Sequence, residues 1–491
     1  MRYDVIIIGA GLSGLTSALL LARTGRKVLV LEQHASPAPV VSGFQRGGIY
    51  FDSGFHYAGG LGEGGPLQLL LRHLGLEEKL QLLPYARDGF DCLRISSSGE
   101  EYALPVGFNN IKTYLGEKFP QARAEIALYI DEIDSIWRKF PYLDLDAELL
   151  DFGMESVHGY SLQQRLEVFS SWPQLQGLLS MHSLLYGVSP DRSPLSLNAQ
   201  VAGSYYHSVH GICGGGRKLV QALLTLLKDV GVEIQCHAEV AQIFSGDNVV
   251  AGVRLQSGEE FFAPEVIATV NPTHLPGMLP PTIMRPAYLK RLNGLYQTTS
   301  AYIIFARSQQ SLEFLRGRNM FIQSQPGVFP GEFDQELEER PFYLAGADQG
   351  GDNVIKGLIG IVPASYSEVE ALDISGRQRT IAYQQWKQEL GARLLRMCRL
   401  KCPQMPPLEL LDLATPLTLR DYSFAPQGAI YGVGRVLGQY NPHPVTRLPG
   451  LFLAGQGVAG PGLLGSLVSG YLACGSILGH ELLRGELRGC R

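Results

Sequence analysis

The sequence predicts an α/β protein in which a parallel sheet is combined with a second, interleaved α+β domain. Three observations support this prediction. A glycine-rich turn joins an apolar strand to a helix near residue 10. The same pattern of short apolar strands and glycines recurs in two later blocks of the chain. The segments between those blocks contain helical and strand-like stretches but no comparable motif.

The first expected elements are a buried strand, a tight turn and a helix. The run Val5-Ile6-Ile7-Ile8 is continuous and β-branched, as a strand covered on both faces requires. It leads into Gly9-Ala10-Gly11-Leu12-Ser13-Gly14, a G-x-G-x-x-G, and then into an apolar helical stretch. Glycines at these places allow a tight turn, close backbone approach to a pyrophosphate and close helix-to-strand contact.

The second strand completes a Rossmann-like nucleotide-binding unit. Val28 to Leu31 is apolar and ends at Glu32, 18 residues past Gly14, where a carboxylate can accept hydrogen bonds from a ribose. The helix start offers free N–H groups to phosphates. A glycine-rich turn in an ordinary α/β domain would leave Glu32 without a role. The cofactor contacts expected here come from Gly9, Ala10, Gly11, Ser13, Gly14, Glu32 and Gln33.

The remaining elements indicate two discontinuous domains. A chain of 491 residues exceeds one hydrophobic core. Strand-like runs at 232–234, 250–255 and 266–270, with a hairpin turn at Asp247-Asn248, suggest a return to the first domain. We expect a cofactor domain at 1–70, 200–275 and 405–491, and a substrate domain at 71–199 and 276–404.

Composition limits the partners of the protein. A net charge of −5 and the absence of a basic run argue against nucleic acid. Seven scattered cysteines without a C-x-x-C suit a reducing compartment, and no metal-ligand set is evident. Because the first strand starts near Tyr3, no signal peptide is expected, and the cytoplasm is the expected location. The apolar stretch Leu463 to Leu478 is too short for a membrane span.

Two further motifs indicate that the expected ligand is a long nucleotide. Val240 follows a strand where a backbone edge can meet an adenine. The strand ending at Gly455-Gln456 precedes a helix start at Gly462-Leu463, which offers a second helix N-terminus to an electron-rich group. Two helix ends suit a long dinucleotide, so FAD fits better than NAD.

At this point the chain resembles the flavoprotein family of phytoene desaturases, carotenoid isomerases and retinol saturases, with the closest likeness to its all-trans-retinol 13,14-reductase branch. The resemblance spans both ends and the 211–272 block, and the substrate segments are recognisable only by position. Four passages carry it: the N-terminal motif through Glu32-Gln33-His34; Phe51-Asp52-Ser53-Gly54-Phe55-His56-Tyr57-Ala58-Gly59; Thr415-Pro416-Leu417-Thr418 with Gly428-Ala429-Ile430-Tyr431-Gly432; and Leu453-Ala454-Gly455-Gln456.

The resemblance implies an FAD-dependent oxidoreductase that saturates a double bond of a hydrophobic polyene such as a retinoid or carotenoid. It places the His56-Tyr57 loop beside the flavin ring, so His56, Tyr57 or Tyr431 is a candidate proton donor. A hydrogen-bonded structural histidine and a packed tyrosine are the alternative readings. Asp52 is expected to cap the following turn.

One departure from the family pattern concerns the pyrophosphate. Relatives carry Gly-Gly shortly after the ribose-binding acid, whereas this chain has Ala38-Pro39. Proline lacks an N–H donor, so one phosphate contact is placed in doubt.

Three rival functions remain open. Desaturation or cis–trans isomerisation would use the same fold and cofactor. An amine-oxidase-like enzyme would need an aromatic pair that cages the amine, and the sequence identifies none. A non-enzymatic binder of prenylated proteins, similar to GDP-dissociation inhibitors, would not need the intact glycines and Glu32. A polyene substrate is compatible with peripheral membrane contact, and a separate electron donor or acceptor is left open.

Overall fold

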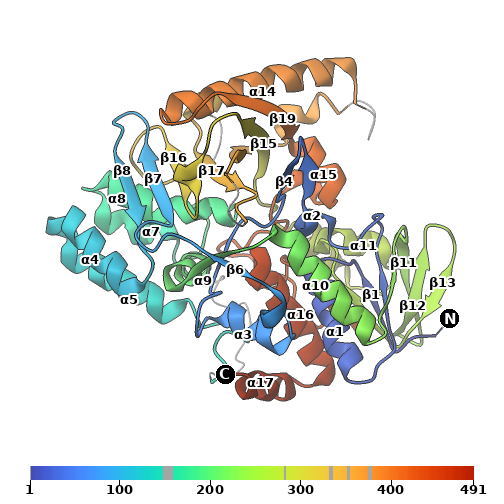
Figure 1. Cartoon of the computed structure of the whole chain (residues 1–491). Coiled ribbons are helices and arrows are strands. Elements are labelled where there is room, and N and C mark those ends of the chain that lie inside the picture. Colours follow the sequence, from blue (N-terminus) through green and yellow to red (C-terminus); the bar gives the residue numbers. More distant parts are fainter. Residues whose placement is uncertain (1, 147–158, 281–282, 331–334, 351–353, 374–378) are drawn as a thin grey trace.

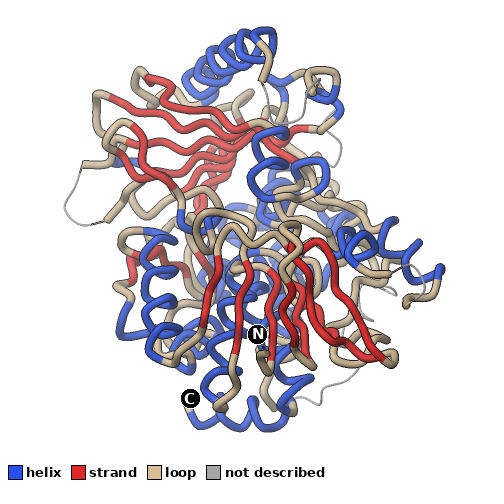
Figure 2. Tube along the Cα trace, turned by 90° about the vertical axis from the view of Figure 1, so that its right-hand side faces the viewer, coloured by secondary structure: helices blue, strands red, loops and turns tan. Residues whose placement is uncertain are grey.

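The computed structural model describes residues 2–146, 159–280, 283–330, 335–350, 354–373 and 379–491. Two main sheets organise these residues (Figure 1). One is parallel and is flanked by α1, α10 and α16. The other has seven strands and lies under the long helix α14. Figure 2 shows the two sheets as separate groups of strands. The arrangement agrees with the predicted α/β fold.

The parallel sheet forms where the sequence predicts apolar runs. Its strand order is β10-β2-β1-β14-β20, and every pair is parallel. Strand β1 is buried on both faces, with Ile7 facing the helices and Ile6 and Ile8 facing the other side. The strands span Val5–Ile8 (β1), Val28–Leu31 (β2), Glu233–Gln235 (β10), Glu265–Ala268 (β14) and Leu451–Leu453 (β20).

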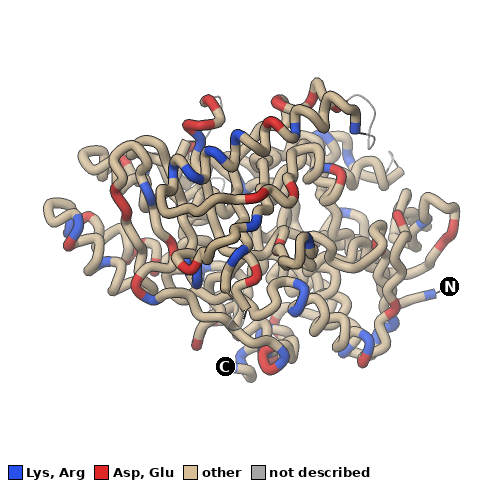
Figure 3. Tube along the Cα trace, turned by 45° about the horizontal axis from the view of Figure 1, so that its top comes forward, with Lys and Arg blue, Asp and Glu red and all other residues tan. Residues whose placement is uncertain are grey.

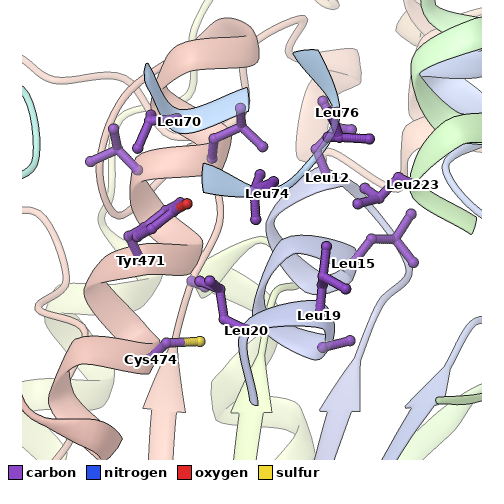
Figure 4. Close-up of a cluster of buried hydrophobic side chains, with 14 of the residues drawn as sticks. Leu12, Leu15, Leu19, Leu20, Leu70, Leu74, Leu76, Leu223, Tyr471 and Cys474 are labelled. Carbon is purple, nitrogen blue, oxygen red and sulfur yellow. The ribbon is translucent and has the colours of Figure 1, made fainter. Parts of the chain in front are cut away.

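Helices cover one face of this sheet. Figure 4 shows Leu15 and Leu19 of one helix, Leu70 of a second and Tyr471 of a third meeting in one apolar cluster. Burying each leucine contributes roughly 1.5–3 kcal/mol, so the cluster fixes the helices against the strands. The helices are α1 (Leu12–Arg23), α3 (Pro66–His73), α10 (Gly215–Asp229), α16 (Gly462–Leu478) and α17 (His480–Gly489).

An antiparallel sheet covers the opposite face. It consists of β11 (Val240–Gly246), β12 (Val249–Leu255) and β13 (Glu260–Phe262). Asp247 and Asn248 join the first two strands with φ of 50° and 61°. Two consecutive left-handed residues are the signature of a tight hairpin turn, as predicted from the sequence.

The seven-stranded sheet is mixed. Its order is β19-β15-β18-β17-β16-β7-β8, and only β7 and β16 pair in parallel. Although the expected boundary at residue 405 assigns the segment after it to the cofactor domain, β19 pairs with β15 in this sheet. The strands span Asp91–Ile95 (β7), Glu101–Leu104 (β8), Ser300–Ser308 (β15), Asn319–Gln323 (β16), Phe342–Ala347 (β17), Gly357–Ala364 (β18) and Leu408–Ala414 (β19).

Helices lie on both faces of the seven-stranded sheet. Phe321 and Tyr343 pack against one helical layer, whereas Ile322 and Leu344 pack in the cluster that contains the long helix α14 (Ile381–Lys401). The first layer consists of α4 (Phe108–Lys118), α5 (Arg123–Ile136), α7 (Leu162–Leu166), α8 (Pro173–Ser180) and α9 (Leu195–His207).

Short elements connect the two main sheets. Strand β9 pairs with β5 and β6, and β3 pairs with β4. These strands span Phe44–Arg46 (β3), Ile49–Phe51 (β4), Ala58–Gly59 (β5), Leu82–Pro84 (β6) and Val209–Ile212 (β9). The remaining α-helices among the described residues are α2 (Pro39–Ser42), α11 (Leu275–Met278), α12 (Pro286–Asn293), α13 (Ser367–Glu370) and α15 (Pro416–Ser423).

Charged residues are distributed over the elements of both main sheets. Figure 3 shows basic and acidic positions interspersed along the same elements. Among the helices that the structure describes, none combines the length and apolar character needed to cross a bilayer.

Candidate functional site

The glycine turn between β1 and α1 has the geometry that a pyrophosphate requires. Gly9 has a φ of +101°, which a side chain would strain. A Cβ on Gly14 would lie 2.1 Å from the carbonyl oxygen of Gly9, so only glycine permits this contact. A Cβ on Gly11 would meet no atom within 4 Å, so this glycine borders open space. The N-terminus of α1 has no side-chain cap among the described residues.

Glu32 is held in a fixed orientation at the end of β2. Its side chain is buried, and Oε2 accepts a hydrogen bond from the N–H of Ala10 at 2.7 Å. Oε1 accepts from the N–H of His34 at 2.9 Å. Each carboxylate oxygen keeps a further lone pair that can accept from a ribose hydroxyl. Gln33, half-buried, follows directly.

Val240 lies near the same end of the sheet. The N–H of Ala238 donates to the carbonyl oxygen of Glu32 at 2.8 Å, which holds the start of β11 against the end of β2. Val240 is half-buried at the first position of β11. The predicted adenine contact and the predicted ribose contact are therefore neighbours in space.

The second predicted helix start follows strand β20. Gly455 has a φ of +117°, and its N–H donates to Ser469 Oγ at 2.7 Å. Gln456 is half-buried beside it. Helix α16 begins at Gly462, where a Cβ would meet open space, and Leu463 follows as a buried residue. No described side chain caps this helix start.

The two helix starts belong to helices that pack side by side. Ser13 Oγ donates to the carbonyl oxygen of Ser466 at 2.8 Å, which joins α1 to α16. Gly470 permits the close approach, because a Cβ there would lie 3.0 Å from the Ser13 carbonyl oxygen. The Ser13 hydroxyl therefore contacts the neighbouring helix, and two uncapped N-termini adjoin.

At the Ala38-Pro39 departure, the chain is hydrogen-bonded to the glycine turn. Ala38 is buried, has a φ of 45°, and donates its N–H to the carbonyl oxygen of Ala10 at 2.9 Å. A left-handed conformation costs a non-glycine residue roughly 1–2 kcal/mol. The hydrogen bond to Ala10 holds this strained residue beside the glycine turn.

A cavity of about 120 Å³ brings the candidate catalytic residues together with the start of α16. His56, Tyr57 and Tyr431 line it, as do Gly462 and Leu463. Its wall contains no Asp, Glu, Lys or Arg among the described residues. The other lining residues are Gly54, Phe55, Ala58, Gly59, Phe140, Leu143, Leu185, Leu197, Gln200, Val201, Ser204, Tyr205, Ala459, Gly460, Pro461, Leu464, Gly465 and Val468.

His56 is half-buried, and one of its ring nitrogens is buried without a partner among the described residues. Its Nδ1 has no hydrogen-bond partner among the described residues. Burial lowers the pKa of His56 to about 4, because an imidazolium would lose its hydration. The side chain is therefore neutral at pH 7. Because Nδ1 makes no hydrogen bond with the described residues, this atom does not support the alternative that His56 is a hydrogen-bonded structural histidine.

The two tyrosines differ in their hydrogen bonds. The hydroxyl of Tyr57 donates to Asp91 Oδ2 at 2.8 Å, and the hydroxyl of Tyr431 donates to the carbonyl oxygen of Leu184 at 3.4 Å. Burial raises the pKa of both phenols above their ordinary value. Tyr57 has the stronger contact because its acceptor is a carboxylate.

Sequence reasoning missed three residues of this region. Tyr205 lines the cavity, and Asp91 and His182 form a buried pair behind Tyr57. They come from segments without a recognisable motif, and their spacing along the chain carries no signal.

Asp52 has a different role from the one expected. Its Oδ1 accepts from the N–H of Gly216 at 2.8 Å and from the hydroxyl of Tyr50 at 3.0 Å. The prediction that it caps its own following turn is wrong, because the carboxylate reaches the N-terminus of α10 instead. Burial raises the pKa of Asp52 to about 7.

The parallel sheet, glycine turn, oriented Glu32 and paired helix starts define a dinucleotide-binding protein of the flavoprotein class. Residues 12–338 match the model of the family described as flavin containing amine oxidoreductase, and the chain belongs to this family. The predicted fold class, FAD cofactor and oxidoreductase activity are thereby confirmed.

Individual relatives agree with the family resemblance. The chain is 25% identical to all-trans-retinol 13,14-reductase of Rattus norvegicus, over 93% of this chain and 82% of the relative. It is 27% identical to hydroxyneurosporene desaturase of Rubrivivax gelatinosus, over 93% and 89%. It is also 27% identical to chloroplastic prolycopene isomerase of Daucus carota, over 55% and 46%.

Solved structures show the same fold. An oxidoreductase from Methanosarcina mazei matches with a TM-score of 0.69 at 18% identity, covering 97% of this chain and 99% of the other. Wild-type putrescine oxidase matches with a TM-score of 0.62 at 16% identity, covering 97% and 99%.

Proposed function

We propose that this FAD-dependent oxidoreductase saturates a carbon–carbon double bond of a hydrophobic polyene, a retinoid or a carotenoid. The observation that carries this proposal is the cavity wall, which is mainly aliphatic and aromatic, has few polar side chains, and lacks a charged side chain among the described residues. An uncharged, extended apolar substrate suits such a wall. A 25% identical relative named all-trans-retinol 13,14-reductase supports the direction of the reaction.

The residues around the glycine turn fit FAD. Open space over Gly11, the close contact of Gly14 and the oriented carboxylate of Glu32 suit a pyrophosphate and a ribose. We assign the ADP moiety to Gly9, Ala10, Gly11, Ser13, Gly14, Glu32, Gln33 and Val240, and the flavin end to Gly455, Gln456, Gly462 and Leu463. When bound, FAD supplies the two-electron hydride chemistry.

The residues of the protein orient the polyene and donate one proton to it. The apolar wall excludes water and places one double bond beside the flavin end of the cofactor site. His56, Tyr57 and Tyr431 all line the cavity, so each is within the region where a carbon must be protonated. Tyr57 is our first candidate for the proton donor because its hydroxyl is hydrogen-bonded to a second group, Asp91, through which a proton can be replaced.

One observation favours desaturation as a second candidate. His56 is neutral at pH 7, since its pKa is lowered to about 4, and a neutral imidazole accepts a proton more readily than it gives one. Proton removal from a carbon, paired with hydride loss, is the chemistry of a desaturase. A relative named hydroxyneurosporene desaturase matches over 93% of this chain.

We propose a cytoplasmic location with peripheral membrane contact and a separate electron donor. All seven cysteines are free in the structure, which suits a reducing compartment. A polyene partitions into lipid, so the protein must meet a membrane or a carrier to obtain it.

The spectrum of the bound flavin tests the substrate class. FAD-loaded protein is reduced with dithionite without oxygen and mixed with all-trans-retinol or a carotene. Reoxidation of the flavin by a polyene supports the proposal. In a parallel sample of oxidised protein, putrescine serves as the control; bleaching by putrescine, without reaction of either polyene, contradicts it.

A further inference from the structure

A buried acid–base pair lies behind the cavity. Asp91 at the start of β7 and His182 in the 3-10 helix η4 (Met181–Leu185) are both 0% exposed. His182 Nε2 lies 2.9 Å from Asp91 Oδ2. Neither residue contributes to the cofactor site described above.

Asp91 gathers hydrogen bonds from three separate parts of the chain. Its Oδ2 contacts both His182 and the hydroxyl of Tyr57, which lies at 2.8 Å. Its Oδ1 accepts from Asn319 Nδ2 of β16 at 2.9 Å. One carboxylate oxygen therefore bridges an imidazole and a phenol.

The pair is costly to keep in the interior. Taking a carboxylate out of water costs several kcal/mol unless its partners compensate, and apolar side chains of similar volume are often equally stable or more so. His182 Nδ1 remains without a hydrogen-bond partner among the described residues, so the cluster is not optimised for stability alone.

Tyr57 connects the pair to the cavity. Tyr57 lines the cavity, and its ring centroid lies 4.7 Å from that of Tyr205, which lines the cavity too. The Tyr57 ring also stacks on Tyr85, with ring centroids 5.3 Å apart. Packing therefore fixes the phenol between the cavity and Asp91.

We propose that Asp91 and His182 hold the proton that Tyr57 delivers to the substrate, so that Tyr57 is the catalytic acid and the pair is its proton reservoir. This inference rests on the proposed function and deepens it. Asp91 and His182 act through Tyr57 and are positioning residues.

The step balances as follows. The Tyr57 O–H bond breaks as a new C–H bond forms at one polyene carbon, while the other carbon receives a hydride and its two electrons from reduced flavin. The phenolate oxygen takes a proton from Asp91 Oδ2, which in turn takes the proton of His182 Nε2. The pair thereby loses one unit of positive charge, and it recovers the proton from solvent water when the flavin is next reduced.

Two physical effects drive this transfer. Burial and the nearby Asp91 raise the pKa of Tyr57 well above its ordinary value, so a phenolate takes a proton back at once. Reduction adds negative charge beside the cavity, which favours proton uptake by a buried group close to it. Tyr85, Tyr205 and Tyr343 are further titratable groups packed around Tyr57, and His56 packs against Tyr343.

Three variants test the proposal in the full-length, FAD-loaded protein. Tyr57→Phe removes only the hydroxyl, and Asp91→Asn keeps the shape of the side chain but not its charge. Tyr129→Phe is the matched control, because Tyr129 is equally buried in the same core cluster and its hydroxyl lies 3.4 Å from Asn198. If Asp91→Asn fails to bind FAD, Tyr57→Phe carries the test.

The first readout is a single turnover with dithionite-reduced protein and all-trans-retinol. We expect Tyr57→Phe and Asp91→Asn to slow flavin reoxidation by about 100-fold or more at unchanged retinol affinity. The solvent deuterium isotope effect of the wild type should change in both variants. The control should stay within about twofold of the wild type. Wild-type rates and isotope effects in both test variants would overturn the proposal.

The second readout needs no substrate and separates this proposal from the proposed function. It is the pH dependence of the flavin reduction potential. We expect a different slope in Asp91→Asn from that in the wild type and in Tyr129→Phe. A protein inert toward polyenes that still shows this difference would lose the proposed function but keep the proton reservoir. Identical slopes in all three proteins would overturn the reservoir.

Discussion

Gly14 of α1 lies directly against the carbonyl oxygen of Gly9, so close that a Cβ on Gly14 would come within 2.1 Å of it. The same turn leaves Gly11 facing open space. Gly14 is therefore required for the fold, whereas Gly11 is required for the cofactor that the turn binds.

Alanine at these two positions should separate the two requirements. Gly14→Ala should destabilise the apoprotein by several kcal/mol, since backbone cannot move away as a side chain can. Gly11→Ala should unfold at the same denaturant concentration as the wild-type apoprotein but bind FAD at least about tenfold more weakly. Denaturant unfolding and FAD titration measure the two effects. Equal losses of stability in both variants would contradict this assignment.

Glu32 should contribute to FAD affinity through its charge and its fixed orientation. Glu32→Gln keeps one acceptor oxygen but loses the charge, and we expect a loss in affinity of about 10- to 100-fold. The matched control is Glu233→Gln, on neighbouring strand β10, whose carboxylate accepts from Tyr3. FAD affinity that is equal in both variants would exclude a ribose contact by Glu32.

His56 should make the protein less stable in mild acid. Its folded pKa of about 4 lies below the ordinary value of 6.5, so the unfolded chain binds the proton first. The contribution of His56 to the free energy of unfolding should fall as the pH drops from about 6.5 to about 4, by no more than about 3 kcal/mol, and an opposing contribution from Asp52 offsets part of this fall in the wild type. His56→Phe should lose this slope, which denaturant unfolding across the pH range will reveal.

Asp52 should produce the opposite slope. Its folded pKa of about 7 lies above the ordinary value of 3.8, so stability is greatest in acid and falls as the pH rises from about 4 to about 7. Asp52→Asn retains the acceptor for Gly216 and should remove this loss. In the wild type the two slopes partly cancel. A flat profile in both single variants would show that neither group titrates as described.

Ala38 should tolerate glycine better than other alanines do. At a φ of 45°, Ala38→Gly relieves the left-handed strain but adds chain entropy to the unfolded state, so we expect unchanged or increased stability, within about 1 kcal/mol. Ala35→Gly, at an exposed position without a positive φ, is the control and should be neutral or destabilising. A larger loss of stability in Ala38→Gly than in Ala35→Gly would contradict the claim that Ala38 is strained.

The parallel sheet and glycine turn were predictable because their signals are local. A β-branched run, a G-x-G-x-x-G and an acid at a set distance each specify one backbone feature, and the structure has β1, the turn and Glu32 in those places. The hairpin at Asp247-Asn248 was predictable for the same reason.

The hydrogen-bonded cluster behind the cavity was not predictable. Asp91, His182 and Asn319 meet Tyr57 only because β7, η4 and β16 converge in the folded chain. No spacing rule connects residues so far apart. Asp52 shows the same limit, since its partner Gly216 lies 164 residues away.

The most direct test of the central claim is the mass of the product formed from all-trans-retinol. FAD-loaded, dithionite-reduced protein is incubated with retinol without oxygen, and the extract is analysed by mass spectrometry and absorbance. A saturase must yield a product that has gained two hydrogens and absorbs at shorter wavelength. Retinol recovered with unchanged mass, whether as the same or as a new geometric isomer, would contradict the proposed reaction.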